Sequence, residues 1–288
     1  MAKIHAIKHR IRSVAKVGQI TKAMEKVAAS KMRRAQAATL RSRTYAASAW
    51  EILQRLYQMT PSSYHELFAK RVGPNRLLIL FSSDRGLAGA YNSNLFKLFL
   101  AELKDRQPAP QVIVIGRKGA DFLSRLGNAA RVIGVYADLY AEPTIADVQP
   151  ITQTAIRLFT ERAVDKVELI YTDFISAARQ EVTRRTLLPL GTSTREALIG
   201  QNLQETTFEP APAAVLKYVI PRILEVQVYQ AALEALASEH SMRMVAMKNA
   251  SDNAEELSDD LTLLYNRARQ GTITQELAEI TAGAEAIT

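Results

Sequence analysis

The sequence predicts an α/β protein in which a long helix at each end of the chain flanks a central domain with a largely parallel sheet. Breakers of regular structure are concentrated in the middle: all ten prolines and nine of the twelve glycines lie between Pro61 and Pro221. Apolar residues recur at helical spacing at both ends, and β-branched runs alternate with helical patterns between them. We therefore divide the chain into an N-terminal helix (1–60), a central domain with its connection (61–211) and a C-terminal helix (212–288).

The first segment, from Lys3 to Met59, is predicted to be one helix because it is rich in Ala, Lys, Arg, Met and Gln. Two sets of apolar residues step by three and four: Ile4, Ile7, Ile11 and Val14, then Val17, Ile20, Met24 and Val27. The sets join by a step of three where a heptad repeat needs four, which is a stammer. A helix of roughly 55 residues would be about 80 Å long, so we expect it to extend beyond a small domain.

The C-terminal segment carries the stronger coiled-coil pattern. One seam keeps a three/four spacing over five heptads: Leu233, Leu236, His240, Arg243, Met247, Ala250, Ala254, Leu257, Leu261, Leu264 and Ala268. Two features leave the course of this helix open. Gly271, followed by Thr272 and Gln275, could end one helix and cap another, and Pro221 could bend the helix near its start.

Charge is distributed unevenly along the chain. The formal net charge is +8, but residues 1–45 carry +11, the remainder carries −3, and the last fifty residues carry −5. Opposite charge on two seams favours an antiparallel coiled coil within one chain. The alternative is a pair of separate amphipathic helices that lie on the central domain.

The middle of the chain reads as strands alternating with helices. Strands are predicted at Arg76–Ser82, Gln111–Ile115, Arg131–Tyr136, Val167–Thr172 and Gln180–Leu188. Helices are predicted at Ser93–Arg106, Lys118–Leu126 and Ile145–Ala163. This alternation is typical of a Rossmann-like α/β layer with a largely parallel sheet.

Motifs for catalysis or cofactor binding are absent from the sequence. It has no cysteine, no P-loop and no G-x-S-x-G or H-E-x-x-H motif. The segment 84–89 follows the first strand where a dinucleotide fold holds phosphate, but it has only two glycines, so we favour a structural turn there and at 116–119. His5 and His9 have metal-ligand spacing without a third ligand nearby. We expect no cofactor, no metal and no self-sufficient enzyme.

The basic N-terminal segment has three further interpretations. It could bind nucleic acid through phosphates, lie on an anionic membrane, or be a cleavable organelle presequence. Its long apolar seam argues against nucleic acid because it needs a protein partner, and its Ala- and Val-rich face argues against membrane binding. Periodicity and charge together indicate a scaffold or shaft with a coiled-coil arm.

Four ordered blocks of sequence resemble the gamma subunit of F-type ATP synthase. They are Ile20–Arg33 (ITKAMEKVAASKMR), Ser83–Leu87 (SDRGL), Met244–Ala250 (MVAMKNA), and Ala268–Gln270 with Ile273–Leu277 (ARQ, ITQEL). The patches Phe208–Pro210 and Gln227–Gln230 fit as well. The resemblance covers essentially the whole chain and begins within its first residues, which favours a bacterial protein over one with a presequence.

The resemblance implies a central rotor shaft without catalytic activity of its own. The terminal helices would form an antiparallel coiled coil inside a hexamer of alpha and beta subunits. The central domain would contact the epsilon subunit and the membrane ring of c subunits. Torque would pass between that proton-driven ring and the catalytic hexamer. The chain would bind no nucleic acid, and it would lie at the cytoplasmic face of the bacterial membrane only through the complex.

The resemblance also assigns residues to three surfaces. Contacts with the beta subunit are expected at Lys22, Met24, Lys26, Arg243, Arg269, Gln270 and Thr274. A tip that turns in the hexamer sleeve is expected at Ile280, Ala284 and Ile287. The foot toward the epsilon subunit and the c-ring is expected at Lys31, Arg33, Arg34, Phe208 and Glu209.

Overall fold

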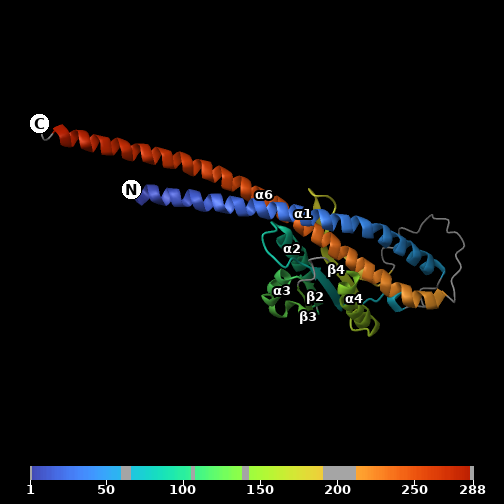
Figure 1. Cartoon of the computed structure of the whole chain (residues 1–288). Coiled ribbons are helices and arrows are strands. Elements are labelled where there is room, and N and C mark those ends of the chain that lie inside the picture. Colours follow the sequence, from blue (N-terminus) through green and yellow to red (C-terminus); the bar gives the residue numbers. More distant parts are fainter. Residues whose placement is uncertain (1, 60–65, 105–107, 138–142, 191–211, 286–288) are drawn as a thin grey trace. The chain divides into compact units, whose positions relative to one another are not determined.

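A computed structural model describes residues 2–59, 66–104, 108–137, 143–190 and 212–285. The chain forms two compact units, one from 1–29 with 243–288 and one from 30–242. Helices α1 (Ala2–Met59) and α6 (Pro212–Glu285) each run through both units (Figure 1). Both long terminal helices are therefore confirmed. The three-part division of the chain stays a prediction.

The 30–242 unit contains the predicted α/β layer. Five strands lie in the order β3-β2-β1-β4-β5. The first four are parallel, and β5 pairs with β4 antiparallel. Their bounds are β1 Arg76–Phe81, β2 Gln111–Ile115, β3 Arg131–Tyr136, β4 Lys166–Phe174 and β5 Gln180–Leu188. The largely parallel sheet is confirmed, and β4 is longer than predicted at both ends.

The predicted helices between the strands are also present. They are α2 Tyr91–Leu103, α3 Arg117–Ser124 and α4 Ile145–Thr160, with short 3₁₀ turns at Glu66–Phe68 and Gly127–Ala129. Helix α4 starts where it does because Thr144 and Asp147 form a capping box. The hydrogen bond from the Thr144 hydroxyl lowers the pKa of Asp147.

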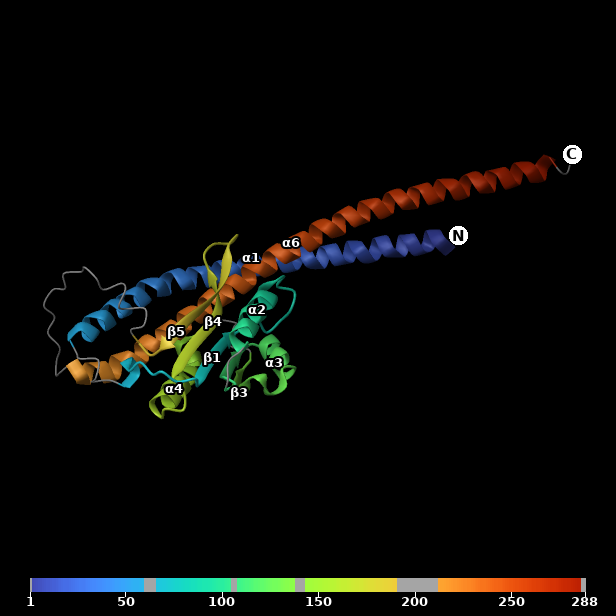
Figure 2. The same cartoon turned by 180° about the vertical axis from the view of Figure 1, so that it is seen from behind.

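Alternate residues of the strands feed two separate cores. On one face, Leu77, Ile79 and Phe81 of β1 join a cluster that includes residues of α4 and α6. On the other face, Leu78 and Leu80 join a cluster with α2 and α3. This alternation follows from the two-residue period of a strand. Figure 2 shows β4 and β5 lying beside α6.

The two long helices form an antiparallel seam within the unit of 1–29 and 243–288, as predicted, but part of its register was wrong. The inward positions on α1 continue without a stammer: Ile4, Ile7, Ile11, Val14, Gly18, Thr21, Glu25 and Ala28. Those on α6 are Met247, Ser251, Ala254, Ser258, Leu261, Tyr265, Ala268 and Thr272. Of the predicted seam residues, Val17, Ile20, Val27, Leu257 and Leu264 are exposed instead.

Small and self-satisfied side chains explain this register. Gly18 lets the two backbones approach, since a methyl group at that position would lie 3.4 Å from the Cβ of Ala254. The Thr21 hydroxyl donates to the carbonyl oxygens of Val17 and Gly18 at 3.1 and 3.0 Å, so it can be buried without another partner. A prediction that considers only large apolar residues therefore selects the wrong positions on α1 from Val17 onward.

Helix α6 continues through both of its uncertain points. Pro221 and Gly271 lie inside the helix. The Thr272 hydroxyl donates to the carbonyl oxygen of Ala268, four residues earlier, as it does inside a continuous helix. The possible stop and capping box at Gly271 are therefore wrong. Across the described residues, no helix has the length and apolar character needed to cross a membrane.

Replacing Gly271 with alanine is expected to stabilise α6 by about 1 kcal/mol, because glycine is a poor helix former. Nothing lies within 4 Å of the methyl group that alanine would add. Thermal unfolding of the full chain followed by circular dichroism, together with local hydrogen exchange around 265–277, measures the effect. Slower exchange is expected in the variant; faster exchange would show that the glycine is needed for a local distortion.

Candidate partner-binding surfaces of the shaft

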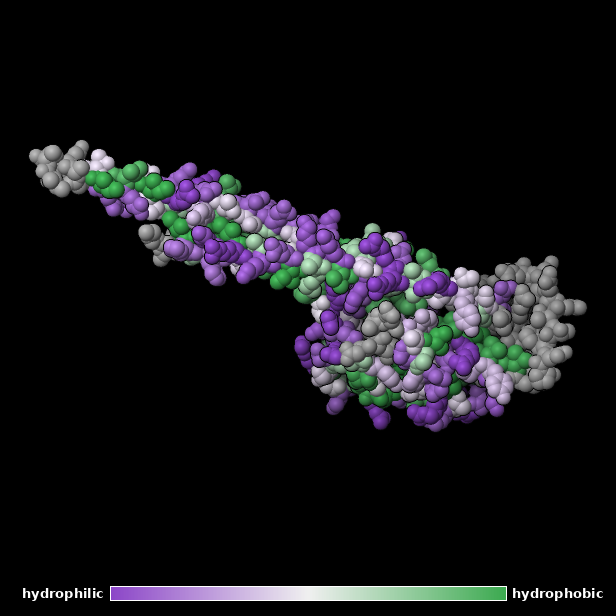
Figure 3. Space-filling model, viewed as in Figure 1, coloured by the Kyte–Doolittle hydropathy of each residue, from purple (hydrophilic) through white to green (hydrophobic). Residues whose placement is uncertain are grey.

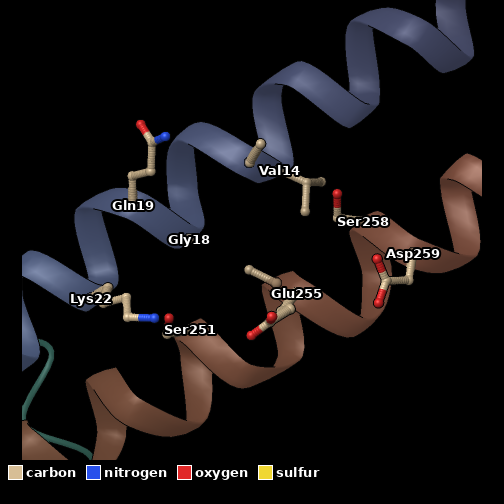
Figure 4. Close-up of a pocket in the computed structure, with 10 residues that line it drawn as sticks. Val14, Gly18, Gln19, Lys22, Ser251, Glu255, Ser258 and Asp259 are labelled. Atoms are coloured by element: carbon tan, nitrogen blue, oxygen red, sulfur yellow. The ribbon is translucent and has the colours of Figure 1, made fainter.

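The unit of 1–29 and 243–288 is called the coiled-coil unit below. A shallow groove of about 250 Å³ runs between α1 and α6 in this unit. Small residues form its floor around Gly18 and Ala254, while Lys22, Glu255 and Asp259 carry charges at its sides (Figure 4). Positive charge from the N-terminal segment thus lies beside negative charge from the C-terminal one. This is the arrangement that the uneven charge of the sequence favours.

The residues expected to contact the beta subunit differ in accessibility. Lys22 and Lys26 are exposed and Met24 is half-buried. On α6, Arg269, Gln270 and Thr274 are exposed; Gln270 and Thr274 lie one turn apart on the same face, whereas Arg269 points to a different side of the helix. Arg243 is only 9% exposed and interacts within the chain. The role of all seven toward a partner stays a prediction.

The expected tip and foot residues are only partly described. Ile280 is 69% exposed on the last part of α6. Ala284 lies in the same helix, and its side chain is outside the described part, as is all of Ile287. In the foot, Lys31, Arg33 and Arg34 are exposed on α1. Phe208 and Glu209 lie outside the described residues.

Sequence reasoning missed a set of outward apolar side chains on the coiled-coil unit. Val17, Ile20 and Val27 are each more than half exposed on α1, and Leu257 and Leu264 are 44% and 49% exposed on α6. Figure 3 shows apolar side chains among hydrophilic ones along this part of the surface. Their helical spacing was visible, but it was assigned to the internal seam. Exposed apolar side chains gathered on one shaft indicate a surface that another protein covers.

The start of α3, which lies within the segment 116–119, has its backbone donors occupied by the chain itself. The first three N–H groups of α3 are used internally: Arg117 N–H donates to Asp84 Oδ1 at 3.0 Å, Lys118 N–H to the Ser83 carbonyl at 3.0 Å, and Gly119 N–H to Ser82 Oγ at 2.8 Å. These donors are what a phosphate would need. The segment 116–119 therefore presents none of these three donors to a ligand, while the interpretation of the loop after β1 as a structural turn stays a prediction.

Removing the Asp84 carboxylate is expected to destabilise the α/β domain without creating or abolishing nucleotide binding. Asp84→Ala loses the acceptor for the Arg117 N–H and should cost about 1 kcal/mol, whereas Asp84→Asn should keep most of that stability. Urea denaturation measures the first effect, and titration calorimetry with ATP on the isolated chain measures the second. ATP binding that disappears in Asp84→Ala would contradict the assignment of this loop as a turn.

Within the described ranges, no three His, Asp or Glu side chains gather closely enough to hold a metal ion. His5 and His9 lie one turn apart on α1, outside any such group.

The known proteins that are similar to this chain support the interpretation of its long helices as a shaft. The family model described as ATP synthase matches residues 3–287. The ATP synthase gamma chain of Moorella thermoacetica is 40% identical over 287 residues, and that of Herpetosiphon aurantiacus is 42% identical over 300 residues; each alignment covers at least 99% of both chains.

Solved structures of rotors share the fold. A central stalk and c-ring structure of Tetrahymena thermophila mitochondrial ATP synthase contains a similar chain, with a TM-score of 0.62, 28% identity, and coverage of 81% of this chain and 99% of that one. A Euglena gracilis mitochondrial ATP synthase structure, with a TM-score of 0.69 at 19% identity over 99% of this chain and 95% of that one, supports the fold alone. Since relatives match over their whole length, this chain belongs to the ATP synthase gamma chain family, the non-catalytic central-stalk subunit of the rotor.

Proposed function

We propose that this chain transmits torque between a proton-driven ring of c subunits and the catalytic hexamer of alpha and beta subunits. The proposal also places the epsilon subunit against the foot residues. The chain lies at the cytoplasmic face of a bacterial membrane only through the complex, and it binds no nucleic acid. The observation that carries the proposal is the antiparallel seam of α1 and α6 in a chain that matches gamma chains over their full length.

The chemistry of the shaft suits rotation. Two helices packed along a continuous seam are stiffer than either helix alone, because bending one requires the other to deform. Apolar side chains on the outside make contacts without directional bonds, so they can slide past a surrounding wall. The exposed polar side chains of Arg269, Gln270 and Thr274 supply directional contacts where torque must be exchanged.

Reconstitution with alpha and beta subunits tests the proposal directly. The isolated chain is expected to show no ATPase activity, to co-purify with the two subunits, and to confer sustained ATP hydrolysis on the assembly. Addition of epsilon and of vesicles that carry the complete membrane sector and stator should then give ATP-driven proton uptake. A chain that does not co-purify, and that instead binds duplex DNA with site selectivity at physiological salt, would replace this function with the nucleic-acid one.

An acidic residue on the outward apolar face is expected to weaken the assembly. Ile20 is 58% exposed in the free chain, so Ile20→Asp should leave its unfolding free energy nearly unchanged. Burying the new carboxylate against a partner should lower affinity for the alpha–beta hexamer at least roughly tenfold. Ser13→Asp, an exposed position on the same helix, is the matched control. Equal affinities for the two variants would show that the hexamer does not cover Ile20.

A further inference from the structure

A long stretch of α6 is buried almost all round inside the 30–242 unit. From Ile223 to Ser241 every residue is buried except Gln227 and Tyr229, which are half-buried. A helix covered on every side is normally apolar throughout. This stretch instead carries polar side chains in its most enclosed part.

Five of these polar side chains form one stripe. Taken at about 100° per residue, the positions fall within an arc of roughly 80°. The stripe consists of Gln227, Gln230, Glu234, Ser238 and Ser241. The residues on either side of it, such as Ala231 on one side and Ala237 on the other, belong to the apolar core. The five polar side chains therefore lie in one line parallel to the helix axis.

The stripe is held by polar groups of α1 and of the β4–β5 hairpin. Toward α1, Gln230 Oε1 accepts from the Ser42 hydroxyl, and Glu234 Oε1 lies 3.4 Å from the Arg43 guanidinium. Within the stripe, Gln230 Nε2 donates to Glu234 Oε1 at 2.8 Å.

Toward the hairpin, the two serines donate to backbone carbonyls. Ser238 Oγ donates to the Thr172 carbonyl at 3.1 Å, and Ser241 Oγ donates to the Ala177 carbonyl at 2.7 Å. Gln180 Nε2 also donates to Ser241 Oγ at 3.1 Å. Arg43 closes the ring of contacts by donating to the Phe174 carbonyl at 3.1 Å. The stripe is thus bound from two sides between Gln230 and Ser241.

Stability does not account for this stripe. Among the described residues, Gln227 Nε2 is buried without a hydrogen-bond partner, as is Thr172 Oγ1 of the facing strand β4. Burial raises the pKa of Glu234, which means that its charged form is held at a cost. Apolar residues of similar volume would serve a stable core as well or better.

We propose that the stripe of Gln227, Gln230, Glu234, Ser238 and Ser241 is a rotational key that locks α6 against turning inside the α/β domain. This inference rests on the proposed function, in which torque received by that domain passes along α6 into the shaft. An apolar interface resists turning weakly because its contacts are non-directional. Turning the keyed helix about its axis carries several polar groups onto apolar walls at once. A buried polar residue fixes the register of coiled coils in the same way.

The test replaces the centre of the stripe with apolar residues in the full chain. In Gln230→Leu/Glu234→Leu/Ser238→Ala, the freed partners keep other contacts: Ser42 donates to the Thr39 carbonyl, and Arg43 donates to Phe174. We expect the unfolding midpoint of the free chain to be unchanged or higher. The variant, assembled with alpha and beta subunits, should nevertheless have a softer connection between domain and shaft.

Torsional stiffness is measured in single assemblies fixed by the hexamer. The sequence has no cysteine, so Ser124→Cys on the exposed surface of α3 gives a unique attachment point for a rotation probe. During catalytic pauses, the angular variance of the probe is expected to be at least about twofold larger in the triple variant, because directional contacts are lost. Glu234→Gln, which keeps an acceptor for Gln230, should behave like the parent chain.

A destabilising control separates stiffness from stability. Leu224 is fully buried in the core on α6 itself, outside the polar stripe, and Leu224→Ala should lower the unfolding midpoint while leaving the angular variance unchanged. The key is rejected if the triple variant keeps the parent variance, or if variance in the two variants follows stability alone. Failure of the parent chain to assemble or rotate would count against the proposed function instead.

Discussion

Replacing Gly116 with alanine is expected to destabilise the α/β domain by about 3–5 kcal/mol, the sum of a strained backbone and a clash. Gly116 joins β2 to α3 with φ at +94°, a conformation that residues with a side chain rarely adopt. A methyl group there would lie 2.2 Å from the carbonyl oxygen of Ser82, which is backbone and cannot move aside. Urea denaturation of the full chain followed by circular dichroism measures the loss.

A second glycine separates the two causes. Gly127 also has a positive φ, +56°, but a methyl group there would meet nothing within 4 Å. Gly127→Ala should therefore show the conformational cost alone, about 1 kcal/mol. If the two variants lose equal stability, close packing against Ser82 is not what fixes the glycine at 116.

The α/β domain could be predicted closely from sequence because its signals are local. The bounds of Gln111–Ile115 and Gln180–Leu188 were predicted to the residue. For Gln111–Ile115 the reason is clear, since a short apolar β-branched stretch bounded by breakers leaves few alternatives. Contacts between distant parts of the chain were harder to predict from the sequence. Nothing local indicated that Asp84 and Ser82 would consume the N–H donors of α3, because those contacts join residues more than thirty positions apart.

The register of the coiled coil was harder to predict because α1 has apolar residues on two of its faces. On α1, Val17 and Ile20 have the hydrophobicity of seam residues, whereas Gly18 and Thr21 occupy the seam. A helix that is covered on one face by its own partner and on another by a different protein carries two apolar stripes. Periodicity shows both stripes without saying which is internal. Family resemblance named contact residues, but it could not supply the polar stripe of α6, which depends on what surrounds the helix.

Removal of the Arg76 guanidinium is expected to cost about 3 kcal/mol, because it leaves a buried carboxylate with weaker partners. Arg76, at the start of β1, donates from Nε to Glu168 Oε2 at 2.9 Å and bridges to Glu102 at 3.0 Å. Glu168 is completely buried on β4. In Arg76→Met it keeps Lys166 at 2.8 Å and Arg184 at 3.5 Å, so the loss is large without being complete.

The double variant Arg76→Met/Glu168→Leu is the matched control. It removes the buried charge together with its partner, while Arg184 can still pair with Glu102. Its stability should be higher than that of Arg76→Met alone, which is the non-additivity expected of a directly interacting pair. A double variant that loses the sum of the two single losses would show that the pair contributes only through packing.

The pH dependence of this loss has a definite sign. Burial by itself raises the pKa of Glu168, but its hydrogen bonds and attraction to Lys166 and Arg76 outweigh burial and hold that pKa below its usual value. The unfolded chain therefore binds the proton first as pH falls, and the stability contributed by Glu168 is full above about pH 5 and declines below the unfolded pKa of about 4.3.

Without Arg76 the pKa of Glu168 in the folded chain must rise, since one of the groups that favours the carboxylate is gone. The difference in unfolding free energy between the parent chain and Arg76→Met should thus be largest near neutral pH and shrink as pH falls toward 4. A difference that stays constant from pH 7 to pH 4 would mean that Arg76 stabilises the sheet through its hydrocarbon stem, and not through the charge that it offers to Glu168.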